Sequence, residues 1–285
     1  MKDLRRGQAL GLLAVAGFSL TLPMTRIAVA ELPPIFVGLG RELAAAVLAA
    51  ALLWIARKPW PTTAQLRPLM GVIAGVVLGF PLFTALAMGH AEASHGAIIL
   101  GLLPLATAAV GVVINQERPS RLFWLAAAIG SAVVVLYALQ AGAGRLSWAD
   151  AALAAAVLFG AVGYASGARL ARSMGAWPVI CWAVVLSAPL LAVIVALLVW
   201  QQPPSASPRA WGAFAYVSTV SALLGFFPWY RGLELGGVAK VSQVMLLQPF
   251  FTLAFAWAVM AEPFTAVSLT CALAVAGSIF VSRKA

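Results

Sequence analysis

The chain has 285 residues, of which 63% are hydrophobic and only 9% are charged, and its mean hydropathy is +1.01. A soluble domain is roughly 45–50% apolar, so this composition excludes a soluble globular protein and predicts an integral membrane protein. The net charge of +10 does not indicate nucleic-acid binding, because the basic residues lie singly or in small groups between apolar segments instead of forming a stripe.

Apolar segments long enough to cross a bilayer follow one another along the whole chain. A transmembrane helix needs about 20 residues, each rising 1.5 Å. We expect spans at residues 9–30, 34–56, 68–89, 94–114, 121–139, 150–170, 178–200, 210–231, 238–260 and 264–282. The predicted fold class is therefore an all-α integral membrane protein with ten transmembrane helices.

The first apolar segment has two interpretations. A basic start, an apolar stretch and Ala28-Val29-Ala30 before Glu31 are also typical of a cleavable signal peptide. The internal repeat described below needs this segment as a structural partner, so we interpret it as the first span.

Basic residues indicate the orientation of the spans. With a cytoplasmic N-terminus, fourteen of the eighteen Lys and Arg residues fall on the cytoplasmic side, whereas only Arg145 and Arg209 fall outside. Cytoplasmic loops of membrane proteins carry an excess of Lys and Arg. We therefore expect an inner-membrane protein with both termini in the cytoplasm.

The two halves of the chain share a pattern of Pro, Gly and Glu. Pro104 is followed by Glu117, and Pro249 by Glu262, at the same spacing of thirteen residues. Further collinear matches at offsets of 145 to 147 residues join Gly79-Phe80-Pro81 to Gly225-Phe226-Phe227-Pro228, and Gly130-Ser131 to Gly277-Ser278. We infer two repeats, residues 1–140 and 146–285. The offset contains five spans, an odd number, so the second repeat has the opposite orientation in the membrane. Inverted repeats are typical of alternating-access transporters.

The chain resembles the EamA type of the drug/metabolite transporter superfamily. The resemblance rests on Pro34, Arg41 and the Ala-rich run after it, Ala85-Leu86, the Pro104 span, Glu117 and the Gly130 span, with their second-half counterparts. It implies ten helices in two repeats and export of amino acids, drugs or other metabolites. Size and aromatic content resemble YddG-type aromatic amino-acid exporters, although Gly17-Phe18-Ser19 stands where the family often has a Trp-Gly pair.

Prolines and glycines inside the spans are candidate hinges. Pro removes a backbone hydrogen bond, so it produces either a static kink or a point of movement. Symmetric placement in the two halves favours hinges, and the candidates are Pro81, Pro104, Pro228, Pro249, Gly79 and Gly225.

Arg26, Arg41 and Glu42 form a predicted charge cluster near the outer ends of the first two spans. A charge within a span costs roughly 2.5 to 3.5 kcal/mol unless it is paired or hydrated. We expect mutual ion pairing or snorkelling, with contact between an Arg and a substrate carboxylate as the alternative. The sequence offers almost no carboxylate near the membrane midplane, which favours a facilitator or ion coupling through Glu117, Glu234 or Glu262.

A small-molecule pocket is mostly apolar and aromatic, with a few polar groups. The candidate substrate-binding residues are Ser19, Thr21, Phe80, Phe83, Tyr164, Ser221, Trp229, Tyr230, Gln243 and Gln248. Packing in the core, against lipid or in the interfacial belt is the alternative role for each aromatic ring.

The sequence favours a transporter of amino acids, including aromatic ones, over two rivals. One rival is efflux of drugs or other metabolites by the same fold. The other is an intramembrane lipid-modifying enzyme, which would need a buried nucleophile with its base or a metal-ligand set. His90 and His95 lie together at one turn, which does not suit either arrangement. We expect no catalytic residues, metal or cofactor; the expected partners are a small-molecule substrate and the lipid bilayer.

Overall fold

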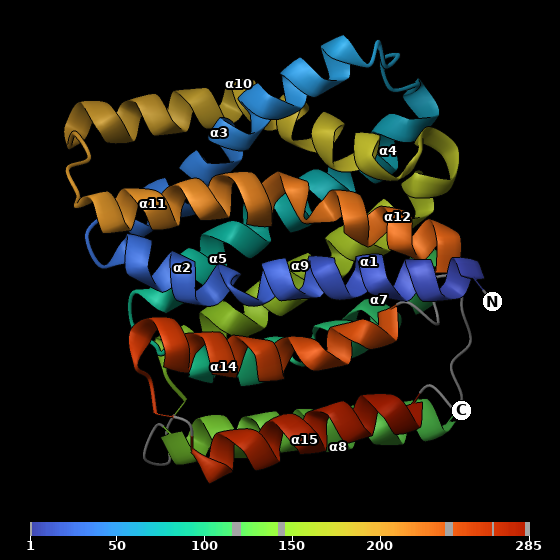
Figure 1. The fold of residues 1–285 in the computed structure, drawn as a ribbon, viewed down its shortest axis with the longest axis vertical. Coiled ribbons are helices and arrows are strands. Elements are labelled where there is room, and N and C mark those ends of the chain that lie inside the picture. The colour runs from blue at the N-terminus through green and yellow to red at the C-terminus, as the bar shows by residue number, and fades with distance from the viewer. Residues whose placement is uncertain (1, 116–120, 142–145, 237–241, 264, 283–285) are drawn as a thin grey trace.

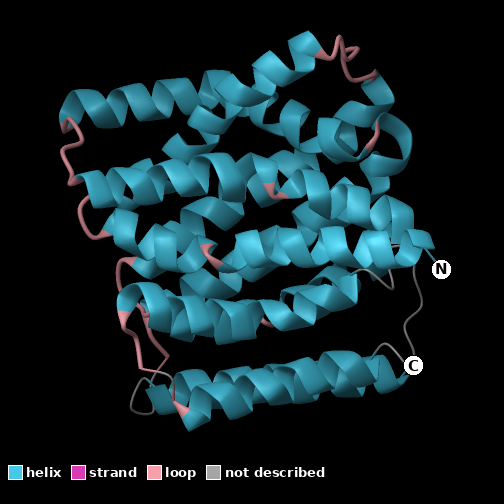
Figure 2. Ribbon diagram, in the orientation of Figure 1, coloured by secondary structure: helices cyan, strands magenta, loops and turns pink. Residues whose placement is uncertain are grey.

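The structure is a computed structural model that describes residues 2–115, 121–141, 146–236, 242–263 and 265–282. Throughout these residues the regular elements are helices, and no strand occurs among them (Figure 2). Most helices lie side by side along one common direction (Figure 1).

The elements of the first half are α1 (Lys2–Ser19), α2 (Thr21–Val29), α3 (Pro34–Ile55), α4 (Thr63–Val72), η1 (Ile73–Gly79), α5 (Phe80–Met88), α6 (Ala93–Leu100), α7 (Leu103–Asn115) and α8 (Arg121–Ala141). Those of the second half are α9 (Trp148–Met174), α10 (Ala176–Gln201), α11 (Pro208–Tyr216), η2 (Val217–Leu224), α12 (Phe226–Gly236), η3 (Ser242–Leu247), α14 (Gln248–Met260) and α15 (Ala266–Ser282).

Several of these elements join end to end into membrane-length helical stretches. Seven stretches within the described residues are long and apolar enough to cross a membrane: Asp3–Val29, Pro34–Ile55, Thr63–Met88, Ala93–Val113, Trp148–Ala171, Ala176–Gln201 and Pro208–Gly232. Three shorter apolar helices, Ala128–Gln140, Gln248–Met260 and Ala266–Gly277, overlap the other expected spans. The predicted all-α membrane fold is confirmed, while the count of ten spans stays a prediction.

Two long stretches contain a π-helical segment in their middle, η1 in the first half and η2 in the second. η1 ends two residues before Pro81, and η2 ends four residues before Pro228. Proline has no N–H to donate to the carbonyl four residues earlier, and its ring clashes with that carbonyl. The chain widens into the π form, in which the main-chain N–H of Gly225 donates to the carbonyl five residues back, at Val220, over 2.8 Å.

Two other stretches lose their regular α-helical form over a few residues, and these places are termed breaks below. Residues Gly101 and Leu102 separate α6 from α7, and the 3₁₀ segment η3 precedes α14. Pro104 and Pro249 stand in the first turn of the helix after each break, where the missing N–H costs nothing. The four candidate prolines thus lie close to irregular backbone, whereas Pro189 lies inside the α-helix α10, and a hinge role stays a prediction.

Glycines allow two helix pairs to approach closely. A Cβ atom on Gly75 of η1 would lie only 2.4 Å from the main-chain nitrogen of Gly163 in α9. A Cβ atom on Gly232 of α12 would lie 2.7 Å from the main-chain oxygen of Gly7 in α1. Close packing of small residues is how membrane helices gain contact without a hydrophobic driving force. Larger side chains at Gly75 or Gly232 would push these helices apart.

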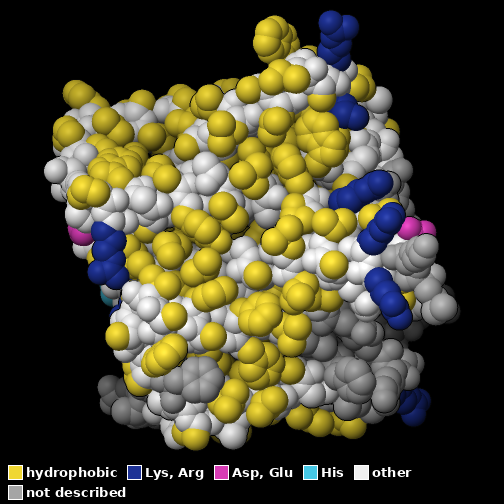
Figure 3. Space-filling model, viewed as in Figure 1, with side chains coloured by type: hydrophobic (Ala, Val, Ile, Leu, Met, Phe, Trp, Pro, Cys, Tyr) yellow, Lys and Arg dark blue, Asp and Glu magenta, His cyan; other side chains and the backbone are white. Residues whose placement is uncertain are grey.

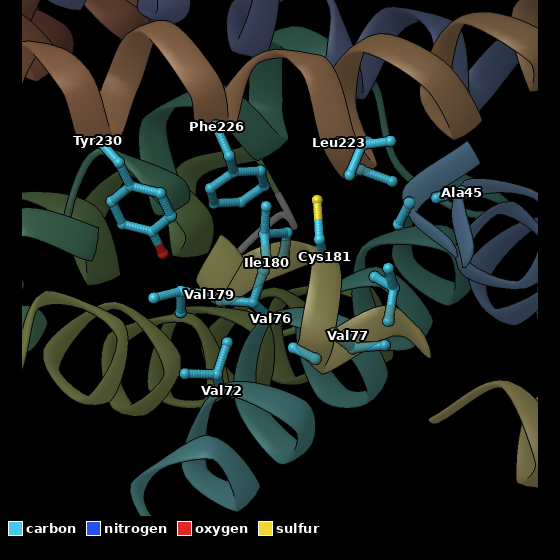
Figure 4. Packing of buried hydrophobic residues seen from close by; sticks show 14 of the residues in the cluster. Ala45, Val72, Val76, Val77, Val179, Ile180, Cys181, Leu223, Phe226 and Tyr230 are labelled. Atoms are coloured by element: carbon cyan, nitrogen blue, oxygen red, sulfur yellow. The ribbon is translucent and has the colours of Figure 1, made fainter. Parts of the chain in front are cut away.

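The largest hydrophobic core lies where η1, α10 and α12 meet α3. Figure 4 shows Val76 and Val77 of η1 grouped with Ile180 and Cys181 of α10 and with Phe226 of α12. All five side chains are buried. This packing fixes Val76 and Phe226, which both reach the cavity described below.

Charged side chains gather at the two ends of the helices (Figure 3). The end at which α1 begins is termed the basic end; its described cations include Arg5, Arg6, Arg57, Lys58, Arg67, Arg121, Arg169 and Arg231. The opposite end carries Arg26, Glu31, Glu92, Asp150, Arg209 and Glu262. The middle of the molecule is almost wholly apolar, as a bilayer requires.

Candidate functional site

A cavity lies at the centre of the helices, between the two ends. It measures about 30 Å³, which is room for about two water molecules. Helices from both halves contribute to its wall, whose residues are Phe18, Thr21, Leu22, Arg41, Glu42, Val76, Phe80, Leu100, Tyr164, Ser221, Ala222, Phe226 and Gln248. We call it the central cavity.

Arg41 and Glu42 bring opposite charges to this cavity. Both side chains are buried, with 3% and 1% of their surface exposed. The Nε–H of Arg41 donates a hydrogen bond of 3.0 Å to Oε1 of Glu42. Arg41 Nη1 and Glu42 Oε2 are buried without a hydrogen-bond partner among the described residues. An unpartnered buried polar group costs about 1–3 kcal/mol, and more when it is charged, so each atom favours a ligand of opposite polarity.

The charge prediction needs correction on two points. Arg41 and Glu42 lie in the central cavity and not near the outer end of a span, so the midplane region does contain a carboxylate. Arg26 belongs elsewhere: its guanidinium lies 3.5 Å from the carboxylate of Glu262 at the opposite end. Arg41 therefore pairs with Glu42 and Arg26 with Glu262, so the three residues do not form one cluster.

Neutral polar groups complete the polar part of the wall. The hydroxyl of Thr21 donates to that of Ser221 over 2.9 Å, which links α2 to η2. Gln248, at the start of α14, lines the same cavity. Its main-chain carbonyl accepts a hydrogen bond of 3.3 Å from the Ser19 hydroxyl, which ties α14 to the end of α1. Thr21, Ser221 and Gln248 are candidates that the structure brings together.

Aromatic rings form the apolar part of the wall. Phe226 lies edge-on to Phe18, with ring centroids 5.0 Å apart, and edge-on to Tyr164 at 6.3 Å. Phe80, which follows η1, lines the same cavity. Edge-to-face pairs of this kind stabilise a fixed arrangement of rings. Phe80 and Tyr164 were candidates from the sequence; Phe18 was not, although it directly precedes the candidate Ser19.

Not every candidate reaches the cavity. Ser19 is buried and donates to the carbonyl of Val15 over 2.6 Å as well as to Gln248, so it supports the break between α1 and α2. Phe83 stacks on Phe159 at 5.5 Å. Trp229 and Tyr230 are buried in the main core.

The Tyr230 hydroxyl is buried without a hydrogen-bond partner among the described residues. The side chain of Gln243 lies outside the described residues.

The candidate hinges cluster around the central cavity. Pro104 and Pro249 line one small neighbouring cavity of about 10 Å³, which shares Leu22, Leu100 and Gln248 with the central one. The breaks in the two halves therefore meet beside the site. Gly79 and Pro81 flank Phe80, whereas Gly225 directly precedes Phe226 and Pro228 lies two residues after it.

The opposite end is held by a set of polar contacts. The carboxylate of Glu262 accepts hydrogen bonds from the main-chain N–H groups of Ala93 and Ser94, at 3.0 and 2.8 Å. Nε2 of His95 lies 2.5 Å from the carboxylate of Asp150. These contacts join α6 to α14 and α9. Within the described residues no group of three His, Cys, Asp or Glu side chains is placed to hold a metal ion.

A helical bundle with membrane-length apolar helices, paired helix breaks and a charged central cavity defines a polytopic membrane transporter as the class of protein. The model of the EamA-like transporter family matches residues 5–139 and 146–283. The chain belongs to this family, within the drug/metabolite transporter superfamily, as its resemblance predicted.

Two relatives are named as transporters, and one solved structure shares the fold. The uncharacterized transporter YdeK of Bacillus subtilis (strain 168) is 41% identical over 270 residues, covering 92% of this chain and 91% of its own length. The uncharacterized transporter YyaM of the same organism is 25% identical over 198 residues, covering 67% and 64%. A solved crystal structure has the same fold with a TM-score of 0.66, at 17% identity over 97% of each chain.

Proposed function

We propose that the protein exports amino acids, including aromatic ones, across the inner (plasma) membrane. The observation that carries the proposal is the buried pair Arg41–Glu42, because each partner keeps one polar atom without a hydrogen bond in the wall of the central cavity. An amino acid carries a carboxylate that suits Arg41 Nη1 and an ammonium group that suits Glu42 Oε2. The rings of Phe18, Phe226 and Phe80 suit an apolar or aromatic side chain.

We further propose that transport proceeds by alternating access between two inverted repeats. Helix pairing supports this arrangement: α1 packs on α12, and α4, η1 and α5 pack on α9. If each helix is replaced by the one five spans away in the chain, the pair of α1 with α12 becomes the pair of α9 with α4, η1 and α5. The same shift of five spans relates η1 to η2 and the break before Pro104 to the break before Pro249. A protein with such internal symmetry has two arrangements of similar energy, each open to one side.

The size of the central cavity is consistent with a closed conformation. A space for about two waters cannot hold a whole amino acid, so substrate entry requires the helices around it to separate. The π segments and the breaks at Pro104 and Pro249 are the places where a small change of backbone angles would permit this. The charge asymmetry of the two ends supports a cytoplasmic location of the basic end and of both termini.

The test is counterflow into proteoliposomes with a panel of labelled amino acids and, as a separate arm, a lipophilic drug cation. We expect exchange of aromatic amino acids. Exchange of the drug cation alone would contradict the amino-acid assignment and favour drug efflux. No exchange of any compound on the panel would also contradict it.

Substrate analogues test the roles of Arg41 and Glu42 separately. Phenylpropionate lacks the ammonium group of phenylalanine, and phenethylamine lacks its carboxylate. We expect each to compete roughly 10- to 100-fold less well than phenylalanine, because one buried charge is left unpaired. In Glu42→Gln the advantage of phenylalanine over phenylpropionate should shrink, and in Arg41→Gln its advantage over phenethylamine should shrink.

Arg67→Gln, at an exposed position on α4, is the matched control and should keep the wild-type ratios. Equal loss for phenylalanine and both analogues in the Arg41 and Glu42 variants would show that the pair has a structural role only. Glu42→Asp and Arg41→Lys keep the charges and should retain part of the discrimination, which separates recognition from loss of folding.

A further inference from the structure

A second, larger cavity lies at the basic end, between α1, α10, α12 and the loop from α3 to α4. Its volume is about 580 Å³, and its wall consists of Leu10, Lys58, Gly175, Ala176, Trp177, Pro178, Phe227, Pro228 and Arg231. It shares no wall residue with the central cavity. Among its described wall residues two are cations, Lys58 and Arg231, and none is acidic, so an anion is the ligand that their charge favours.

Lys58 is held in place by the local structure of the loop. Arg57 adopts a left-handed backbone conformation, with φ of 48°, directly after α3 and its cap residue. The turn allows the main-chain N–H of Lys58 to donate to the carbonyl of Leu53 over 3.0 Å. The ammonium group of Lys58 lies 5.4 Å from the centre of the Trp177 ring. A cation above an indole face is attracted to it, so the positive charge stays at the wall of the cavity.

Two aromatic rings form part of the cavity wall. The rings of Trp177 and Phe227 lie 5.8 Å apart, which joins α10 to α12. Gly175, with φ of +87°, makes the sharp turn from α9 into α10 that brings Trp177 to this position. Arg231 contributes the second cation from the same face of α12 that carries Phe227 and Pro228.

The position of the cavity near the membrane–water interface indicates an amphiphilic anion. Its wall joins the ends of apolar, membrane-length helices to a loop that contains Trp60, whose ring lies 4.7 Å from that of Trp182. Tryptophan rings near helix ends are typical of the membrane–water interface. At that level a phospholipid places its phosphate beside cations and its glycerol and first acyl carbons beside apolar rings. The mixed wall suits an amphiphile better than a bare ion.

We propose that this cavity binds the phosphate headgroup of an anionic phospholipid, with Lys58 and Arg231 facing the phosphate and Trp177 and Phe227 facing the glycerol backbone. The inference does not depend on which substrate the central cavity carries. Free inorganic phosphate offers a similar charged group from the aqueous side, so the experiment includes it as a separate arm.

The experiment measures thermal unfolding of delipidated protein in a neutral detergent after addition of phosphatidylglycerol, phosphatidylethanolamine or inorganic phosphate. Phosphatidylglycerol should raise Tm, and phosphatidylethanolamine and millimolar phosphate should have much smaller effects. Lys58→Gln should reduce the phosphatidylglycerol shift by at least half, while leaving Tm without lipid close to the wild-type value. Arg67→Gln removes a cation from the same end but outside the cavity, and should keep the full shift.

Native mass spectrometry provides a second measurement on the same variants. The number of retained phosphatidylglycerol molecules should fall by one in Lys58→Gln and in Arg231→Gln, but not in Arg67→Gln. A full lipid shift and unchanged retention in Lys58→Gln would overturn the site. An equal shift with inorganic phosphate, or with phosphatidylethanolamine, would overturn its assignment to anionic lipid.

Discussion

The carboxylate of Glu262 accepts a hydrogen bond of 2.8 Å from the main-chain N–H of Ser94, which lies 168 residues earlier in the chain. Its other oxygen accepts from Ala93 at 3.0 Å and lies 3.5 Å from the guanidinium of Arg26. Glu262 thus caps the N-terminus of α6, where the helix dipole favours negative charge. Glu262 lies two residues after the end of α14 and thus connects this end to α6 and α2, and all three helices also line the central cavity.

Glu262→Gln should destabilise the protein and loosen this end. The amide keeps hydrogen-bonding capacity but loses the charge that both the helix terminus and Arg26 favour, so we expect a loss of about 1–3 kcal/mol. Thermal unfolding in detergent measures the change. Glu92→Gln is the control, because Glu92 is exposed at the same end and should have a smaller effect. Equal Tm values for the two variants would contradict the capping role.

The order of the helices and the positions of their breaks follow directly from the sequence. Bilayer thickness sets the length of each apolar segment, which is why the expected range 34–56 agrees with α3 to within one residue. Proline lacks an N–H, so Pro81 and Pro228 indicated places of irregular backbone, although Pro68 and Pro189 lie inside the α-helices α4 and α10.

The composition of the site could be predicted only in part. Successive residues of a helix point in directions about 100° apart, so the sequence alone does not say that Phe18 faces the cavity while Ser19 faces a neighbouring helix. The position of Arg41 in the sequence could have indicated its depth in the membrane. It lies seven residues, or roughly 10 Å, into the span that begins at Pro34, too deep for an outer vestibule. Pairing of Arg26 with Glu262 instead depends on contact between the two halves, which apolar patterning does not reveal.

Restoring a continuous backbone at the paired breaks should slow transport. Pro104→Ala or Pro249→Ala would supply the N–H that proline lacks and would allow a regular helix to extend across the break. We expect the maximal counterflow rate to fall roughly tenfold with little change in KM, since the conformational step and not binding is affected. Pro59→Ala, in the loop between α3 and α4, should leave the rate unchanged.

An unchanged maximal rate in both Pro104→Ala and Pro249→Ala would contradict a hinge role for these prolines. Thermal unfolding of the same variants distinguishes the causes. A lost hinge predicts an equal or higher Tm, whereas general misfolding predicts a lower one.

Glu31 gives the opposite end a dependence on pH. The main-chain N–H and the hydroxyl of Ser207 donate to its carboxylate over 2.6 and 2.7 Å, and these bonds hold the pKa of Glu31 below its ordinary value of 4.5. A depressed folded-state pKa contributes stability above the unfolded-state value, and that contribution disappears as pH falls through the folded-state value. The Tm difference between wild type and Glu31→Gln should therefore be largest above pH 4.5 and shrink below it. A difference that is constant from pH 7 to pH 3.5 would contradict this role.

Phe226 should determine selectivity for aromatic substrates. Its ring is 3% exposed, contacts Phe18 and Tyr164 edge-on, and forms part of the cavity wall from the second half of the chain. Phe226→Leu keeps an apolar side chain of similar bulk but removes the aromatic face, which contributes roughly 0.5–1.5 kcal/mol to a ring pair. We expect KM for phenylalanine and tryptophan to rise about 2- to 10-fold, with a smaller rise for leucine.

Phe83→Leu is the control, because it alters a stacked ring that does not line the cavity. It should leave the KM ratio of phenylalanine to leucine unchanged. If both variants shift that ratio equally, the effect comes from packing, and the rings around Phe226 do not select the substrate.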